Sequence, residues 1–301
     1  MDLSRKSQFL PGEHLQVAQE LQLALLDELA RVVRWRVGDA AFHGGTSIQA
    51  AWNSPRWSED LDFLVGKGRR DALRKAGPTI AANVRVRFAA SYPGCTIEFG
   101  ANAGNPDAQD SMDSWTVKWS HPNRIGKVMV KAEFYATRED ILERYRTRLA
   151  RPQKGNTQIS VMMPVAELVS LWADKVKVVA TRAGFKWRDA HDLAFVAESL
   201  DRNGWPPEDE LAEALATTVS IYGKTLEDIL EGLRTRLDAG VLDDRKAFQE
   251  DMARWFGAEA HTINLGLGVY KQQLERAKAE AAKAEGICTR AIENAAGGPT
   301  P

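Results

Sequence analysis

The segment FHGGTSIQAAWNSPRWSEDLDFLV (residues 42–65) holds a glycine pair, a Thr-Ser pair and, further along, two aspartates inside an apolar run. Gly44 and Gly45 have no Cβ, so their backbone can adopt positive φ and approach a ligand closely. Thr46 and Ser47 are good N-caps, so we expect the glycines to lead into a helix that begins just after them. Free backbone N–H groups at such a terminus favour an anion such as a phosphate.

The two aspartates of this segment flank the start of a predicted strand, Leu61–Val65. Because side chains alternate along a strand, Asp60 and Asp62 project from one face, with Cα atoms about 6.6 Å apart. Carboxylates this close can converge on hard cations, and two Mg²⁺ ions about 3.5–4 Å apart can clamp an in-line phosphoryl displacement. Taken singly, a Gly-Gly-Thr is usually a turn and an Asp-x-Asp strand is often an exposed edge. The spacing of the two halves is therefore the informative feature.

That spacing is an apolar residue, Gly-Gly-Thr, thirteen intervening residues and then Asp–apolar–Asp–apolar. The pattern resembles the signature of the DNA polymerase β-like nucleotidyltransferase superfamily. The residues GGTSIQ…RWSEDLDFLV resemble the AbiEii/AbiGii-type toxin family more closely still. Members of this family are relatives of the mycobacterial MenT toxins. The resemblance implies that Asp60 and Asp62 are catalytic metal ligands for Mg²⁺ or Mn²⁺. It also implies that the substrate NTP is bound by Gly44, Gly45, Thr46 and Ser47.

A third carboxylate is expected from a later strand, Lys127–Tyr135. This stretch alternates, with valines on one face and with Lys131 and Glu133 on the other. Glu133 is thus a candidate to face the aspartate pair of a neighbouring strand. In the superfamily such a carboxylate completes the metal site or acts as a base toward the attacking hydroxyl. The alternative is a surface glutamate beside Lys131, and Glu98 is the second candidate for the role.

The stretch 164–182 predicts an amphipathic helix in which Lys175 lies on the shoulder of the apolar stripe. A lysine there either extends its ammonium toward a triphosphate or reaches out to water. The toxin-family resemblance favours the first, since the family has a lysine followed by Arg-Asp-x-x-Asp. That segment is matched here by Arg188, Asp189 and Asp192. The resemblance implies that Arg188 binds the nucleotide and that one of the two aspartates orients Lys175 or a metal-bound group. The alternative for both is an ordinary acid in the first turn of a helix.

Basic residues gather between the two halves of the chain, with Tyr145 among them. They could form a surface for the RNA backbone, although charge runs are often solvated faces. The candidate RNA-binding residues are Arg144, Arg146, Arg148, Arg151 and Lys154.

The composition is typical of a globular protein, with 44% hydrophobic and 27% charged residues among 301 and a net charge of −1. Bulk charge therefore does not attract the chain to nucleic acid, and a local basic patch would be needed. Cys95 and Cys288 lack metal-type spacing. We find no signal-peptide core and no apolar run approaching the roughly 18 residues that span a bilayer, so we expect a cytoplasmic protein without membrane contact.

Secondary-structure patterns divide the chain into two domains, 1–160 and 161–301. In the first, helices (13–36 and 69–83, the latter with an expected break near Gly77-Pro78) interleave with strands (40–42, 61–65, 96–99, 115–119 and 127–135). This interleaving predicts an α/β (α+β) core, and the resemblance makes it a polymerase β-like core with a mixed sheet. The second domain is predicted to be all helical, with helices at 164–182, 187–200, 207–220, 224–237, 244–256 and about 264–294.

Together these features predict a metal-dependent nucleotidyltransferase that is the toxin of a toxin–antitoxin or phage-defence system. The resemblance implies transfer of a nucleoside monophosphate from an NTP to an RNA, with tRNA as a candidate acceptor, and a separately encoded antitoxin. Two alternatives remain open: a non-catalytic nucleotide- or protein-binding regulatory module, and an antibiotic-type nucleotidyltransferase that acts on small molecules.

Overall fold

The structure is a computed structural model that describes residues 6–9, 12–105 and 111–296. In these ranges no helix combines the length and the apolar character that crossing a membrane requires.

The chain forms two compact units. The first unit comprises Met1–Asn53, Ser58–Leu142 and Thr147–Val165. The second comprises Ala166–Pro301 together with two short segments from the earlier chain, Ser54–Trp57 and Glu143–Arg146. The division into domains 1–160 and 161–301 stays a prediction. It did not include the two four-residue segments of the earlier chain that belong to the second unit.

The first unit is built on a seven-stranded mixed sheet with the strand order β3-β4-β5-β2-β1-β9-β6. β1 pairs antiparallel with β2 and parallel with β9, β2 pairs parallel with β5, and β5-β4-β3 form an antiparallel meander. This sheet confirms the predicted mixed α/β core. The strands are β1 (Ala40–His43), β2 (Leu61–Gly66), β3 (Thr96–Asn102), β4 (Met112–Ser120), β5 (Val128–Thr137), β6 (Thr147–Ala150) and β9 (Met163–Ala166). A separate hairpin joins β7 (Gln153–Lys154) to β8 (Thr157–Gln158).

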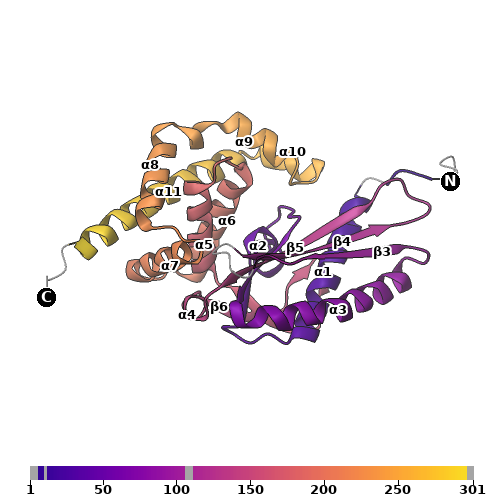
Figure 1. Cartoon of the computed structure of the whole chain (residues 1–301). Coiled ribbons are helices and arrows are strands. Elements are labelled where there is room, and N and C mark those ends of the chain that lie inside the picture. The colour runs from indigo at the N-terminus through magenta and orange to yellow at the C-terminus, as the bar shows by residue number, and fades with distance from the viewer. Residues whose placement is uncertain (1–5, 10–11, 106–110, 297–301) are drawn as a thin grey trace. The chain divides into compact units, whose positions relative to one another are not determined.

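One face of the sheet is apolar and is covered by α1 (Glu13–Val33) and α3 (Arg70–Ser91) (Figure 1). Phe63 and Phe134 stack there with ring centroids 5.1 Å apart. α3, which follows a 3₁₀ turn (Lys67–Arg69), runs unbroken through Pro78, so the predicted break is wrong. An interior proline costs a helix about 3 kcal/mol, and here the buried face of α3 against the sheet outweighs that local cost.

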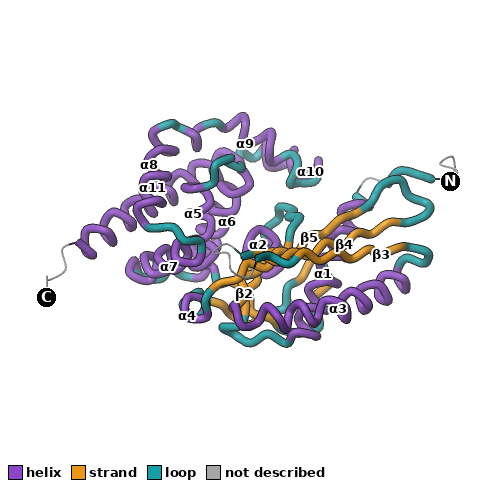
Figure 2. The backbone as a smooth tube through the Cα atoms, in the orientation of Figure 1, coloured by secondary structure: helices purple, strands orange, loops and turns teal. Residues whose placement is uncertain are grey.

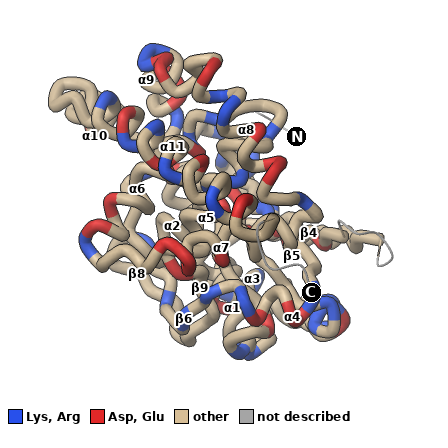
Figure 3. The backbone as a smooth tube through the Cα atoms, turned by 90° about the vertical axis from the view of Figure 1, so that its left-hand side faces the viewer, with Lys and Arg blue, Asp and Glu red and all other residues tan. Residues whose placement is uncertain are grey.

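The second unit is helical, as predicted, and Figure 2 shows it in purple. Its helices are α5 (Leu168–Thr181), α6 (Trp187–Asn203), α7 (Glu208–Ile221), α8 (Leu226–Asp238), α9 (Arg245–Met252), α10 (Ala258–Gly266) and α11 (Val269–Ala296). Two short helices complete the described chain, α4 (Glu139–Leu142) in the first unit and a 3₁₀ turn (Val241–Asp243) in the second. Along α11, Lys and Arg alternate with Asp and Glu (Figure 3), which fits the near-zero net charge.

Several helix boundaries differ from the prediction, and two of the differences have a clear cause in the sequence. The stretch from Met163 is strand β9, whose Val165 pairs with Phe42, so helix α5 begins only at Leu168. Pro164 has no backbone N–H to donate to a helix, and it disfavours the helical conformation in the residue before it. The predicted helix 264–294 is instead α10 followed by α11, separated at Gly268 with its φ of +69°.

Candidate active site

Strand β1 delivers the chain to the glycine pair at the start of α2 (Gly44–Trp52). Gly44 has a φ of +74°, and a Cβ placed on it would lie 2.2 Å from Oδ2 of Asp62. Only glycine fits this position, because any side chain would be strained and would displace the carboxylate. The first turn of α2 thus begins directly against the Asp62 carboxylate, and the predicted link between glycines and a helix N-terminus is confirmed.

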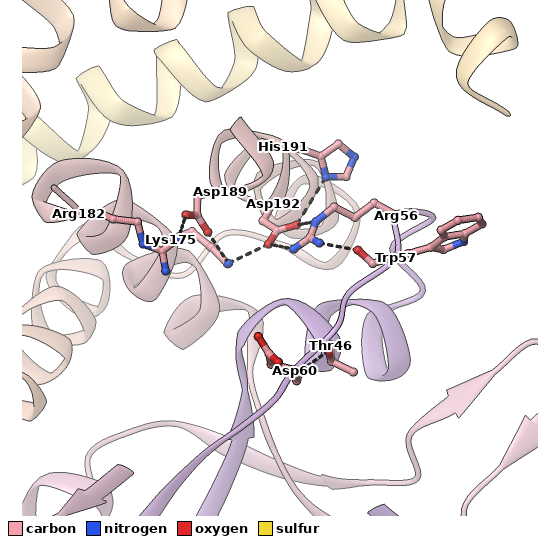
Figure 4. Close-up of polar contacts among 9 residues, drawn as sticks. All are labelled: Thr46, Arg56, Trp57, Asp60, Lys175, Arg182, Asp189, His191 and Asp192. Atoms are coloured by element: carbon pink, nitrogen blue, oxygen red, sulfur yellow. Dashed lines mark hydrogen bonds and ion pairs between the residues drawn. The ribbon is translucent and has the colours of Figure 1, made fainter. Parts of the chain in front are cut away.

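The capping role predicted for Thr46 and Ser47 is wrong. α2 begins at Gly44, so both residues lie inside its first turn, and His43 is the N-cap without a side-chain cap bond. Thr46 instead donates its hydroxyl to the backbone carbonyl of Asp60 (Figure 4). The hydroxyl of Ser47 is buried and has no hydrogen-bond partner among the described residues. Thr46 therefore connects the helix to the start of β2, where the aspartate pair lies.

The third carboxylate comes from the strand next to β2. Asp62 is the register partner of Glu133 in the parallel pair β2–β5. Both side chains are partly exposed, whereas their neighbours Leu61 and Phe134 are buried in the core. Glu98 lies on β3, with β4 and β5 between it and β2, and pairs with Lys127 at 2.8 Å. Glu133 is thus the candidate beside the aspartates, and Glu98 is not.

A cation from the same strand face lies among these carboxylates. The ammonium of Lys131 pairs with Glu133, and their side chains are 39% and 26% exposed. The hydrogen bond to Glu133 and the charges of Glu133, Asp60 and Asp62 raise the pKa of Lys131. In the described residues no group of three or more His, Cys, Asp and Glu side chains is already arranged around a metal position. The donor set is nevertheless made of carboxylate oxygens, the ligands that Mg²⁺ prefers.

A buried ionic network within the second unit joins Lys175, Asp189 and Asp192 of the Lys…Arg-Asp-x-x-Asp pattern (Figure 4). Nζ of Lys175 lies 3.1 Å from Asp189 and 2.8 Å from Asp192. Asp189 also pairs with Arg182. Lys175 is buried, so it does not reach out to water as the alternative prediction had it.

Arg56 belongs to this network and was not anticipated. Its Nε and Nη2 each lie 2.5 Å from a carboxylate oxygen of Asp192, and the two side chains are 2% and 0% exposed. Burial alone would raise the pKa of Asp192, but the charges of Arg56 and Lys175 hold it well below its ordinary value. A single arginine after Pro55, in the spacer between the two motif halves, offers no sequence signal for a partner this distant. Burial likewise opposes the charge of Lys175, while Asp192 and Asp189 raise its pKa.

Arg188, the arginine of the same pattern, lies on α6 beside an aromatic ring. Its guanidinium carbon lies 4.6 Å from the ring centroid of Trp255, a cation–π distance.

The predicted RNA-binding residues do not form one continuous exposed run. Lys154 is buried in the first unit, where its ammonium donates to Gln22 and, at 3.0 Å, to Gln49. Burial lowers its pKa to about 7. Arg146 pairs with Glu210, and Arg148 lies 3.8 Å over the ring of Trp52.

Tyr145, which was expected to interleave with the arginines, is buried and donates to Asp174 at 2.6 Å. Arg144 and Arg151 are exposed. RNA binding by the four arginines of this stretch stays a prediction, and the burial of Lys154 removes it from that surface.

One known protein family is similar to most of this chain. The family model described as nucleotidyl transferase AbiEii toxin, type IV toxin–antitoxin system, matches residues 37–264. No curated protein matches the chain. A crystal structure of a candidate nucleotidyltransferase from Helicobacter pylori is 15% identical, with a TM-score of 0.49 and coverage of 92% of this chain and 97% of that one. The JHP933 protein from Helicobacter pylori is also 15% identical, with a TM-score of 0.47 and coverage of 96% and 98%.

Proposed function

Because the chain belongs to the AbiEii family of nucleotidyltransferase toxins, we propose that it transfers a nucleoside monophosphate from an NTP to an RNA and requires Mg²⁺ or Mn²⁺. The observation that carries the proposal is the contact between Gly44, at the start of α2, and the Asp62 carboxylate, with Glu133 in register on the next strand. An anion-binding helix terminus and cation-binding carboxylates then meet at one point, as the transfer of a phosphoryl group requires.

The residues of this first-unit site have separate tasks in the proposed reaction. The backbone N–H groups at the start of α2 bind the triphosphate, and the side chain of Thr46 holds that helix to the strand of the aspartates. Asp60 and Asp62 hold the cations, with Glu133 as a third carboxylate beside Asp62. When bound, the cations neutralise charge on the phosphates and acidify the attacking hydroxyl.

The bond changes balance as a simple displacement. A ribose hydroxyl oxygen of the acceptor forms a bond to the α-phosphorus, and the bond from that phosphorus to the bridging oxygen breaks. Pyrophosphate leaves with the electron pair, and the hydroxyl proton passes to Glu133 or to solvent. Positioning and charge stabilisation supply most of the rate, since the reaction forms no covalent bond to the protein.

Lys175 and Arg188 are proposed to bind the NTP phosphates. The network around Lys175 holds three cations (Arg56, Lys175, Arg182) against two carboxylates (Asp189, Asp192), so it keeps one net positive charge. Arg188 adds another cation on the same helix as the aspartates. A surplus of positive charge favours a triphosphate. Asp189 and Asp192 then serve as positioning residues for Lys175.

The family description places its toxin in a type IV toxin–antitoxin system, which implies an antitoxin partner. We propose that the antitoxin is a separate protein and that modification of an RNA, with tRNA as the candidate acceptor, accounts for toxicity.

The test is to incubate the protein with each α-labelled NTP, total RNA and Mg²⁺, and to follow the label by gel electrophoresis. We expect label from one NTP to enter an RNA band, no label from the γ-labelled NTP, and loss of transfer in Asp62→Asn. Label that enters only a small-molecule fraction, or no label transfer with any NTP, would overturn the proposal.

A further inference from the structure

The polar face of the sheet continues beyond the acidic residues onto β4 and β3. Register pairs place Asp62 beside Glu133, Glu133 beside Ser114, and Ser114 beside Asn102. One row of polar side chains therefore crosses β2, β5, β4 and β3 on the face opposite the apolar core. The next row places Lys131 beside Thr116, and Thr116 beside Gly100.

A cavity of about 370 Å³ lies at the far end of these rows. This volume is within the range of about 300–1,000 Å³ that is usual for small-ligand sites. Its floor includes Gly100, where an added Cβ would meet only the carbonyl oxygen of Thr116, at 4.0 Å. The side chains of Ser114, Thr116 and Asn102 line it, with Lys118 and Glu98 at one end.

We propose that this groove on β3 and β4, lined by Gly100, Asn102, Ser114 and Thr116, binds the nucleoside of a single-stranded RNA acceptor that carries the attacking hydroxyl. The inference rests on the proposed function and specifies where its acceptor binds.

Sheet order gives the first argument. The glycines of α2, where the triphosphate is proposed to bind, follow β1 on one side of β2. The groove lies on the other side, across β5. In an in-line displacement the attacking hydroxyl and the leaving pyrophosphate lie on opposite sides of the α-phosphorus, so an acceptor belongs on the β5–β4–β3 side. Neighbouring strands are about 4.8 Å apart, which puts Ser114 about 10 Å from Asp62, a span that one nucleoside bridges.

The chemistry of the lining gives the second argument. Hydroxyls and a primary amide both donate and accept hydrogen bonds, which suits the edges of an unstacked base and a ribose 2′-hydroxyl. A triphosphate would instead require several cations, whereas Lys118 is the one cation among the described residues that line the groove. The absence of a side chain at Gly100 keeps the floor open for a flat group.

The substitution that tests the groove is Gly100→Leu. Gly100 does not have a positive φ, and its Cβ direction is open, so leucine fills the groove without backbone strain. The matched control is Gly266→Leu, a glycine with nothing within 4 Å of its Cβ direction on helix α10 of the second unit. Both variants should unfold within a few degrees of the wild type, which circular dichroism checks. Thr116→Val, which keeps the side-chain volume but removes the hydroxyl, is the second variant.

The first readout is direct binding of a 5′-fluorescent single-stranded RNA oligonucleotide by anisotropy, without NTP. We expect Gly100→Leu to weaken it at least tenfold and Thr116→Val severalfold, with Gly266→Leu unchanged. The second readout is steady-state transfer, in which the KM for RNA should rise and the KM for NTP should stay within twofold of the wild type.

Equal RNA affinity in wild type and Gly100→Leu overturns the inference, as does a wild type that binds no single-stranded RNA. A raised KM for NTP with an unchanged KM for RNA also overturns it, since the groove would then hold the donor base. The anisotropy measurement needs no turnover, so a wild type that binds the oligonucleotide but transfers nothing contradicts the proposed function alone.

Discussion

The two acid-bearing motifs of this chain are held in opposite ways. Asp62 and Glu133 lie partly exposed on a sheet face, against the start of a helix and beside a half-exposed lysine. Asp192 is fully buried between Arg56 and Lys175, which compensate its charge. Partly exposed carboxylates can exchange their neighbours for a cation or substrate, whereas a buried, paired carboxylate holds its partners in place. Acids that look alike in sequence therefore divide into partly exposed carboxylates, which can accept a ligand, and a buried carboxylate, which is held by its ion pairs.

The largest expected effect is the loss of nucleotide transfer when an aspartate of the partly exposed site is replaced. Asp62→Asn should lower nucleotide transfer by at least about 1,000-fold, equivalent to about 4 kcal/mol, because a required cation loses a carboxylate ligand. The unfolding temperature should hardly change, since the lost charge lies among like charges on a partly exposed face. Initial rates with saturating NTP and a melting curve on the same sample measure both. Retained transfer would remove Asp62 from the catalytic site.

The opposite behaviour is expected of Asp192→Asn, whose first effect is on stability. It leaves Arg56 and Lys175 charged and buried without their shared partner, which costs about 3–5 kcal/mol. Urea unfolding of this variant and of Asp62→Asn, side by side, measures the difference in the free energy of unfolding. If both variants were equally stable, the buried network would not be what distinguishes the two regions.

A third change tests whether the open site is poised to exchange cations. Lys131→Met removes the ammonium that pairs with Glu133 and repels an incoming metal ion. We expect Mn²⁺ to bind roughly fivefold more tightly, equivalent to about 1 kcal/mol, the size expected of a partly exposed ion pair. Titration of Mn²⁺ followed by electron paramagnetic resonance, without NTP, gives the affinity. Lys127→Met, which disrupts the exposed pair with Glu98, is the control and should leave Mn²⁺ binding unchanged.

The last prediction concerns Lys154, a buried lysine whose ammonium donates to two side-chain amides, in contrast to Lys175 with its carboxylates. Burial lowers the pKa of Lys154 to about 7, from 10.5 in the unfolded chain. Between these values the unfolded state binds more protons, so stability should rise with pH across this window, by at most about 1.4 kcal/mol per pH unit. The cost of the buried charge is fully present below about pH 7. Lys154→Met should remove this slope, as urea unfolding at pH 7 and pH 9.5 would reveal, and an identical slope in wild type and variant would contradict the assignment.

How much the sequence predicts depends on the range of the interactions. The alternation of β5 and the glycine–aspartate spacing are local patterns, and both led to the correct strand faces and to the helix start at the glycines. The third carboxylate was also predictable, because a period of two leaves Glu133 on the same face as Lys131.

Features that depend on distant partners were not predictable. Arg56 is 136 residues from Asp192, and no local pattern connects them. Lys154 belongs to a basic run in sequence, yet it is buried because the hairpin β7–β8 brings it to Gln22 and Gln49. The prediction of Thr46 and Ser47 as N-caps was wrong because the helix begins at Gly44, whose φ is positive, two residues before Thr46.

The position of Arg56 also has a consequence for how the protein folds during synthesis. During synthesis the segment Ser54–Trp57 emerges early, but it belongs to a unit whose remaining chain is mostly made later. Arg56 therefore cannot pair with Asp192 until that later residue has left the ribosome. The second unit thus cannot complete its interior from its consecutive stretch of chain alone. A fragment that begins at residue 166 would carry Asp192 and Lys175 without the guanidinium of Arg56 that pairs with Asp192. The two units are distinct in the folded chain, but neither corresponds to one consecutive stretch of sequence.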